Sequence, residues 1–360
     1  MNVKLLFAVS ALALVVAGWF AGAGATATNA ARSGATFAQA AAALRQPELD
    51  LWSAKPGLGA RATTDVLLRV PNGAAEAGKM TLYVPAGYAI NPADPVGTKE
   101  GTVFMQTASD FAVGDLKAVD PAAYVNTPQA QACAPGTHVG VWTMNLGFVA
   151  GSTKLTVPIY IDPTSGDETA LGAYKLQACL PLAGVASPGG WPIGSRVRDL
   201  DLEFTRLTNP ASAGLYVWKG FVDNPDASGN PDPTTTYELR ADMPLPAKLG
   251  LTGKLDRKHR RAVFSGRLAA QAMSVGGVPV SLYRATGDGN WAFVAETRTS
   301  ATGSYRFSRR ITRTTTYSTE ISGIRNCVGA STAPGGCLDE TLAAIDSSNV
   351  RIVVRARRHR

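Results

Sequence analysis

One segment of the chain, DLDLEF at residues 199–204, places three carboxylates where they could act together on a substrate. Asp199, Asp201 and Glu203 alternate with apolar residues, and alternate residues of a β-strand share one face. Successive residues of one face lie about 6.5–7 Å apart along the strand. Flexible carboxylates at this spacing could reach the ~5.5 Å separation of a retaining glycoside hydrolase, or the longer separation of an inverting one. The chemistry that such a set of carboxylates could perform is hydrolysis of a glycosidic bond.

The same segment is similar to the Glu-x-Asp-x-x-Glu or Glu-x-Asp-x-Glu strand of the laminarinase-like glycoside hydrolases, which are also β-sandwiches. It departs from that motif at Asp199, which stands one methylene short of the nucleophilic Glu of the family. Two nearby arginines, Arg196 and Arg198, favour ordinary ion pairing on a solvated strand face. We take the solvated face as the main interpretation and catalysis as the alternative.

Aromatic residues give a second candidate contact surface. Tyr216 and Trp218 flank Val217, so the two rings share one face of a strand. A sugar-stacking platform needs such rings to point outward, whereas core packing is the usual role of aromatic residues on strands. We expect core packing here and keep sugar binding as the alternative.

Other catalytic chemistry has little support. His138 is the one histidine outside the Arg-rich runs, but no GxSxG nucleophile motif occurs anywhere in the chain. No CxxC spacing occurs either, so a zinc or thioredoxin-type site is not indicated. We predict no catalytic residue, no metal and no cofactor.

The elements that must position these residues are short strands. The 360 residues include 37 Gly and 22 Pro, and 17 % are charged, a composition that favours many strands joined by turns over long helices. Alternating apolar segments run from TDVLLRV to GLYVWKGFVD and begin again after a linker that contains Pro244 and Pro246. We predict an all-β chain with two consecutive β-sandwich (immunoglobulin-like) domains, at residues 61–246 and 247–360.

The second domain resembles a known class of module. Its segments FSGRL, GVPVSLYR, WAFVAETRTSATGSYRF and TTTYSTEISG resemble the bacterial immunoglobulin-like and carboxypeptidase-regulatory-like (CnaB-type) β-sandwich modules of secreted proteins. The resemblance implies a sandwich that acts as a spacer or stabilising stalk. Within it, Gly303 is expected to supply a hairpin turn that residues with a Cβ resist. We assign the first domain to no family.

The start of the chain predicts export. An apolar run follows Lys4 and ends in small residues, which is typical of a signal peptide, here over residues 1–27. An uncleaved anchor is the alternative, because residues 5–20 nearly reach the ~18 apolar residues of a membrane-spanning helix. We expect a flexible Ala-rich lead-in over residues 28–60, no later membrane-spanning segment, and a secreted or cell-surface protein.

The chain has four cysteines, and an even number in an exported protein predicts two disulfide bonds. Four cysteines allow three pairings. We favour Cys133 with Cys179 and Cys327 with Cys337, because each pair lies within one proposed domain.

Charge is distributed unevenly along the chain. Residues 248–360 hold 19 Lys and Arg against 7 Asp and Glu, a net charge of +12, and the remaining residues carry a net charge of −4. The basic residues cluster in DRKHRR, SRRITR and the tail RARRHR. Such clusters attract anionic envelope polymers, although a merely solvated surface is the commoner role of basic runs. No recognition helix or stacking motif accompanies them, so we expect no sequence-specific nucleic-acid partner.

The function that these observations favour is that of an exported, non-catalytic β-sandwich protein with a structural, adhesive or binding role at the cell surface. The alternative is a secreted carbohydrate-active protein that binds or hydrolyses glycans through the carboxylates of residues 199–203 or the aromatic pair.

Overall fold

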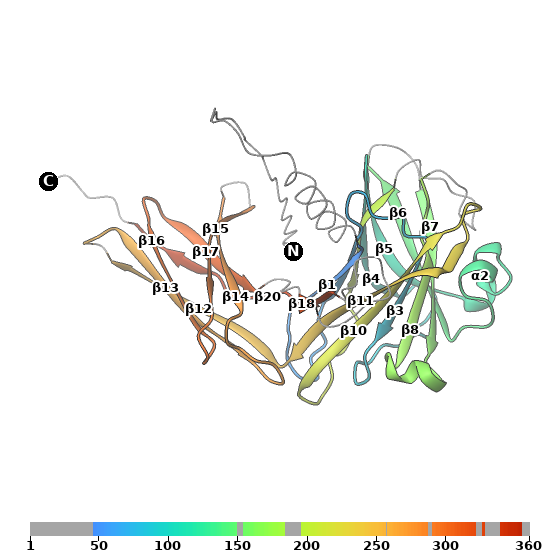
Figure 1. The fold of residues 1–360 in the computed structure, drawn as a ribbon, viewed down its shortest axis with the longest axis horizontal. Coiled ribbons are helices and arrows are strands. Elements are labelled where there is room, and N and C mark those ends of the chain that lie inside the picture. The colour runs from blue at the N-terminus through green and yellow to red at the C-terminus, as the bar shows by residue number, and fades with distance from the viewer. Residues whose placement is uncertain are drawn as a thin grey trace, which may run out of the picture.

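The computed structural model describes residues 46–149, 154–183, 196–256, 258–286, 290–321, 326–327 and 339–354. Nearly all the regular secondary structure of the described chain is β-strand, which confirms the predicted all-β class. Figure 1 shows two units side by side, a large one built mainly from the strands between residues 48 and 245 and a smaller one built from the strands that follow. The expected signal peptide and most of the lead-in lie outside the described residues, as do Cys337 and the basic tail.

A thirteen-stranded sheet forms the larger unit. In spatial order its strands are β1 (Glu48–Ser53), β2 (Thr64–Arg69), β9 (Val197–Phe204), β4 (Lys99–Thr107), β5 (Phe111–Val119), β6 (Gly140–Phe148), β7 (Lys154–Pro163), β8 (Tyr174–Cys179), β3 (Lys79–Val84), β10 (Gly214–Pro225), β11 (Pro231–Leu245), β19 (Asp339–Leu342) and β18 (Asn326–Cys327). Neighbours are antiparallel except β11 and β19, which are parallel.

The large sheet curls back on itself into a nearly closed barrel. At the end of β19 the chain reaches β1: Thr341 Oγ1 of β19 donates to the Leu49 carbonyl (2.5 Å), and just after the strand the Ala344 amide donates to the Leu51 carbonyl (2.7 Å). The end of β19 therefore meets β1, the strand at the opposite edge of the sheet, through a parallel bridge between Trp52 and Ala344. The prediction that this unit is one of two immunoglobulin-like sandwiches is corrected: curling one sheet pairs nearly all of its strand edges, whereas two stacked sheets leave edges open.

The barrel interior is filled by alternate residues of its strands, as period-two packing requires. Its fully buried side chains come from strands all round the barrel: Leu68, Leu82, Met105, Leu116, Met144, Ile159, Leu176, Leu200, Trp218 and Val222. Short helices lie outside the strands, namely the 3₁₀ turns η1 (Pro121–Tyr124) and η2 (Gly166–Ala170) and the helix α2 (Pro128–Cys133). No helix in the described ranges is long and apolar enough to cross a membrane.

The smaller unit packs two sheets over one core. One sheet has the order β12 (Ala247–Asp256), β13 (Arg261–Ala270) and β16 (Ser304–Arg310). The other has the order β15 (Trp291–Arg298), β14 (Pro279–Ala285), β17 (Thr315–Ile321) and β20 (Ile345–Asp346), with β21 (Val350–Ile352) also paired to β17. The predicted alternation is confirmed, because Val278, Val280 and Leu282 are all buried in this core, as are Tyr305 and Phe307.

Gly303 occupies the hairpin turn before β16, as predicted. Its φ of +79° lies in the left-handed region that side chains resist, and a Cβ there would come within 2.2 Å of the Leu268 carbonyl oxygen. Both the turn and the close backbone approach therefore require glycine at this position.

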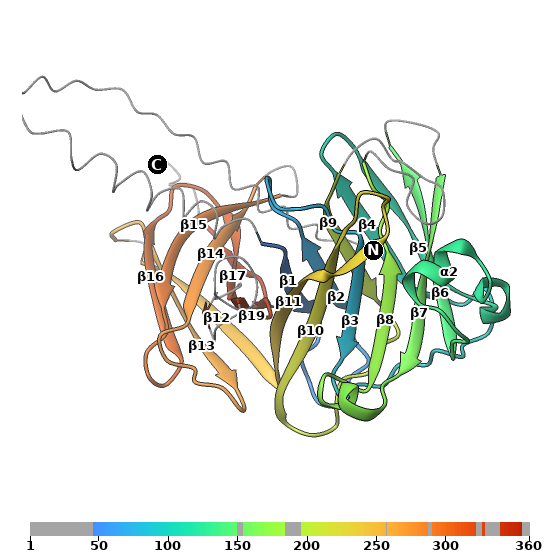
Figure 2. The same cartoon turned by 45° about the vertical axis from the view of Figure 1, so that its right-hand side comes forward.

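Two expected boundaries differ from the structure. The segment expected to be a flexible lead-in, residues 28–60, contains strand β1 with Leu49 and Leu51 each 2 % exposed, so that expectation is wrong for Glu48–Ser53. The predicted boundary at residue 246 does separate the two hydrophobic cores. It does not assign every later residue to the smaller unit, because β18 and β19 return to the barrel sheet. Figure 2 shows β19 at the junction, between β11 and β12.

Candidate functional site: an acidic face on the barrel

The three predicted carboxylates lie on the outer face of β9, which lies between β2 and β4 and is the third strand from one edge of the barrel sheet. Leu200, Leu202 and Phe204 point into the core with 0, 1 and 4 % of their surface exposed. Asp199, Asp201 and Glu203 have the opposite parity and are partly exposed. The shared face that the alternation predicted is confirmed.

Neighbouring strands add two further carboxylates to this face. Asp65 of β2 is the direct cross-strand partner of Glu203, and Leu67, two residues further on, pairs with both Asp201 and Asp50. Directly opposed side chains have Cβ atoms about 4.5–5.5 Å apart. We name as the acidic face the outward carboxylates Asp50, Asp65, Asp199, Asp201 and Glu203.

Arg69 is the cation that meets these carboxylates. Its guanidinium lies 3.2 Å from Asp50 and 3.4 Å from Asp199. The arginines that the sequence suggested for this role instead donate to backbone carbonyls, Arg196 to Ala74 (3.4 Å) and Arg198 to Pro71 (3.3 Å). Ion pairing by Arg196 and Arg198 is therefore corrected. The cation is Arg69 on the adjacent strand, because a cross-strand side chain lies closer than one further along the same strand.

Crowding and burial shift the titration of the acidic face. Burial, followed by the charges of Asp201 and Glu203, raises the pKa of Asp65 to about 8. Burial, followed by the charges of Glu203 and Asp199, raises the pKa of Asp201 to about 6. Burial also raises the pKa of Asp50, despite the opposing effect of Arg69. The Oδ1 atoms of Asp65 and Asp201 are out of contact with solvent and have no hydrogen-bond partner in the described chain.

The chemical consequence is that, near neutral pH, the acidic face carries a protonated carboxyl group at Asp65 and an ionised one at Asp201, on neighbouring strands. That combination is what general acid catalysis requires. Glu203 is held in place by Thr102, whose Oγ1 donates to its Oε2 at 2.8 Å. Among the residues described, His, Cys, Asp and Glu form no group of three that could hold a metal ion.

The surface beside these carboxylates is apolar. Phe104 of β4 pairs with Asp201 and lies 5.9 Å, centroid to centroid, from Phe111 of β5. Phe111 is 43 % exposed and Val113 is 50 % exposed. The acidic face thus presents carboxylates beside the partly buried ring of Phe104 and the exposed ring of Phe111.

The barrel also has an open hollow of about 370 Å³ away from this face, between η2 and the strands β10 and β11, where Lys219 and Arg240 line it.

The second candidate surface, formed by Tyr216 and Trp218, does not present two outward rings as a sugar-stacking platform would. Tyr216 and Trp218 do share a side, since both rings contact Tyr88 at 5.7 and 5.1 Å. Trp218, however, is 0 % exposed and belongs to the barrel core. Tyr216 is partly buried and donates its hydroxyl to the Ser212 carbonyl (2.7 Å). Sugar stacking on Trp218 is therefore ruled out by burial, and the expected core packing is correct.

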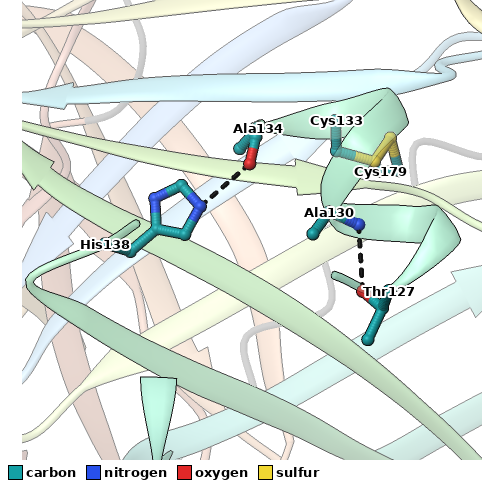
Figure 3. The surroundings of a disulfide bond; sticks show 6 residues. All are labelled: Thr127, Ala130, Cys133, Ala134, His138 and Cys179. Carbon is teal, nitrogen blue, oxygen red and sulfur yellow. Dashed lines mark hydrogen bonds between the residues drawn. A yellow bond between two sulfur atoms is a disulfide. The ribbon is translucent and has the colours of Figure 1, made fainter. Parts of the chain in front are cut away.

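His138 supports the attachment of helix α2 (Figure 3). Its side chain is 3 % exposed, with Nδ1 2.8 Å from Asp162 and Nε2 2.8 Å from the Ala134 carbonyl. The adjacent Cys133–Cys179 disulfide joins the end of α2 to the end of β8, with Cα atoms 5.7 Å apart, which confirms the predicted pairing. The side chains of Cys327 and Cys337 lie outside the described residues.

Sequence reasoning missed a buried acid pair at one end of the barrel. Glu100 is 2 % exposed, and Arg206 Nε lies 3.4 Å from its Oε2 and 3.0 Å from Asp94 Oδ2. Burial, followed by the interaction with Asp94, raises the pKa of Glu100 to about 7. Burial acts to raise the pKa of Asp94, but the hydrogen bonds to its carboxylate outweigh burial and lower this pKa below its usual value. A small cavity beside Glu100 is also lined by Trp142 and Arg206.

The pattern of β4 hides this pair. Val103 and Met105 point inward, so simple alternation places Gly101 inward and Glu100 outward. The register with β5 shifts between Lys99 and Gly101, and the irregularity turns Glu100 into the barrel. Only the unusual sequence Lys-Glu-Gly at the start of an apolar strand hints at the bulge.

Comparison with protein-family models gives no match to this chain, and comparison with curated proteins gives none either.

Proposed function

We propose that this protein is an exported, non-catalytic structural or binding protein of the cell surface, in which the barrel and the smaller unit act as one body. The observation that carries the proposal is the return of β19 to the barrel. Its residues pair with Arg240–Asp242 of β11, and the chain then continues directly into β20 of the smaller unit.

The junction is reinforced by side chains from both ends of the chain. Trp52 of β1 donates its indole N–H to Asp346 of β20 at 3.1 Å. Thr341 is 3 % exposed and Ala343 is 0 % exposed, so this crossing segment is part of the packed interior. Pulling the two units apart would break strand pairing in the barrel as well as contacts at the junction. Such an arrangement suits a spacer that must keep its orientation.

Two further features support export and a stalk-like role. The Cys133–Cys179 disulfide fits an oxidising compartment. The two-sheet packing of the smaller unit agrees with the resemblance to immunoglobulin-like and carboxypeptidase-regulatory-like modules, which serve as spacers in secreted proteins.

The test is fractionation of the cells that carry the protein, with an antibody against the native chain. We expect the protein in the envelope or the medium, with the first residues removed. A matched variant that lacks residues 1–27 should remain in the cytosol. Recovery of the unaltered chain in the cytosol would overturn the proposal.

A second candidate, a carbohydrate-active protein, is favoured by one observation, the raised carboxyl pKa values of Asp65 and Asp201 beside Glu203. Glycan turnover by the purified chain, lost in Glu203→Gln and retained in the control Glu296→Gln, would support it. Glu296 is an exposed carboxylate of the smaller unit, so the control makes the same change away from the acidic face. Absence of turnover by the unaltered chain across β-glucans and wall polymers would remove this candidate.

A further inference from the structure

The three-stranded sheet of the smaller unit has a strongly basic outer face. Its inner face is fixed by Leu249, Phe264 and Phe307, which are all buried in the core. Residues of opposite parity therefore point to solvent. We name as the basic face the exposed outward cations Lys248, Lys254, Arg261, Arg267, Arg306 and Arg310.

Strand register brings several of these cations together. Arg261 of β13 lies directly opposite Arg310 of β16, and Arg306 lies opposite Ser265 in the same pair of strands. Like charges that face each other across a sheet destabilise it. Each guanidinium keeps free donors, because Arg261 uses Nε for Ser308 Oγ (3.1 Å) and Arg267 uses Nε for the Thr302 carbonyl (3.0 Å).

Within the described chain no carboxylate forms an ion pair with any of these six cations. The only acidic residue on the three strands is Asp256, which is opposite Arg261 in register. Its carboxylate is taken up by the hairpin turn, where it accepts from the His259 ring (2.7 Å) and from the amides of Lys258 (3.0 Å) and His259 (3.2 Å). The repulsion on the basic face is therefore left for an external anion to relieve.

We propose that the basic face binds a linear phosphodiester polymer of the cell envelope, an inference that rests on the proposed surface location. Arg261 and Arg267 are six residues apart on β13, which is about 20 Å along a strand. A single ion cannot span that distance, whereas a chain with repeated charges can contact both ends. Arginine forks match phosphate oxygens in pairs, so phosphate is favoured over isolated carboxylates.

The remaining residues of this face disfavour other polyanions. The uncharged outward residues are Gly250, Thr252, Val263, Ser265, Ala269, Ser304 and Ser308. None is aromatic, so single-stranded nucleic acid would lack the stacking surfaces that usually hold its bases. No large apolar side chain is available to enter a bilayer either. The face offers charge and small hydroxyls, which suits a polyol phosphate backbone.

The experiment measures binding of the full exported chain to poly(glycerol phosphate) over a salt series, with a polycarboxylate glycan and single-stranded DNA of similar length as comparisons. Arg261→Gln with Arg310→Gln removes the facing pair. The matched control is Arg284→Gln with Arg351→Gln, which removes two exposed arginines of the opposite sheet. Both variants leave the basic tail unchanged.

We expect poly(glycerol phosphate) to bind most tightly of the three polymers. The facing-pair variant should bind about tenfold more weakly at about 50 mM salt, with the slope of log affinity against log salt reduced by about 1 to 2, and the control should change less than about twofold. Equal binding by the two variants would overturn the inference. Tighter binding of DNA or of the polycarboxylate would overturn it as well.

The inference and the proposed function can fail separately. If the protein fractionates with the envelope but the facing-pair variant binds the polymer normally, the inference fails and the surface location stands. If the facing pair governs binding to the purified polymer but the native chain is recovered in the cytosol, the proposed function fails.

Discussion

The acidic face of the barrel and the basic face of the smaller unit are both clusters of like charge on strands, but they relieve repulsion in different ways. On the acidic face, partial burial and crowding raise the pKa of Asp65 to about 8 and that of Asp201 to about 6, so Asp65 is protonated at neutral pH and Asp201 becomes protonated below about pH 6. Arginine cannot give up its proton in proteins. The basic face, which is fully outward, must instead recruit counter-ions. The comparison predicts that the first face responds to pH and the second to salt.

The largest expected effect concerns the core beneath the acidic face. Leu200→Ala removes a side chain that is 0 % exposed and should lower the free energy of unfolding by about 2–5 kcal/mol, because it leaves a cavity in the barrel. Urea denaturation measures this change. Gln106→Ala, at an exposed position beside β9, is the matched control and should change stability by less than about 0.5 kcal/mol. A similar small loss for Leu200→Ala would mean that β9 is not packed as described.

The next largest effect tests the predicted response of the acidic face to pH. Asp65 has a folded pKa of about 8 against 3.8 for an unperturbed carboxyl, so between these values the folded chain holds a proton that the unfolded chain releases. Its contribution to stability is present below about pH 4 and is lost as the pH rises to about 8. Asp65→Asn should match the unaltered chain at pH 4 and exceed its stability by about 1–3 kcal/mol at pH 8.

The measurement is denaturant unfolding of both chains between pH 4 and 8. Asp256→Asn is a suitable comparison, since hydrogen bonds from His259 lower the pKa of Asp256 and a change there should not reproduce the gain at pH 8. If Asp65→Asn and the unaltered chain keep parallel stability curves, the acidic face does not hold a proton near neutral pH.

A smaller effect concerns the segment that joins the two regions. Thr341→Val keeps the shape of the side chain but removes its buried hydrogen bond to the Leu49 carbonyl. The free energy of unfolding should fall by about 0.5–1.5 kcal/mol. Amide exchange of residues 48–53 should also become faster, because their pairing closes the barrel. Thr252→Val, at an exposed position of β12, is the control. Unchanged exchange in β1 would argue against closure of the barrel through β19.

The smallest expected effect tests the predicted response of the basic face to salt. Arg310→Gln relieves the repulsion with Arg261 and should stabilise the chain by about 0.2–1 kcal/mol at low salt. The gain should disappear near 1 M salt, where the Debye length is about 3 Å. Thermal unfolding at two salt concentrations measures it. A gain that persists at high salt would point to packing rather than to charge.

Much of the acidic face could be read from the sequence because alternation is a local property. DLDLEF alone places its three carboxylates on one side and its three apolar residues on the other. The companions of that face could not be read, because Asp65 and Arg69 come from a strand more than a hundred residues away in the chain. The direction of Trp218 was also open, since an isolated strand does not reveal which side faces the core.

The sequence by itself determined the all-β class, the alternation within strands and the turn at Gly303, and it favoured the pairing of Cys133 with Cys179 among the three possible pairings. These follow from short-range chemistry: strand propensity, side-chain parity, the conformational freedom of glycine, and proximity along the chain. The tertiary structure alone decided the closure of the barrel by β19, the neighbours of Glu203 and the inward turn of Glu100. Each depends on strand register and order across distant segments, which local patterns leave free because period-two alternation is compatible with many pairings.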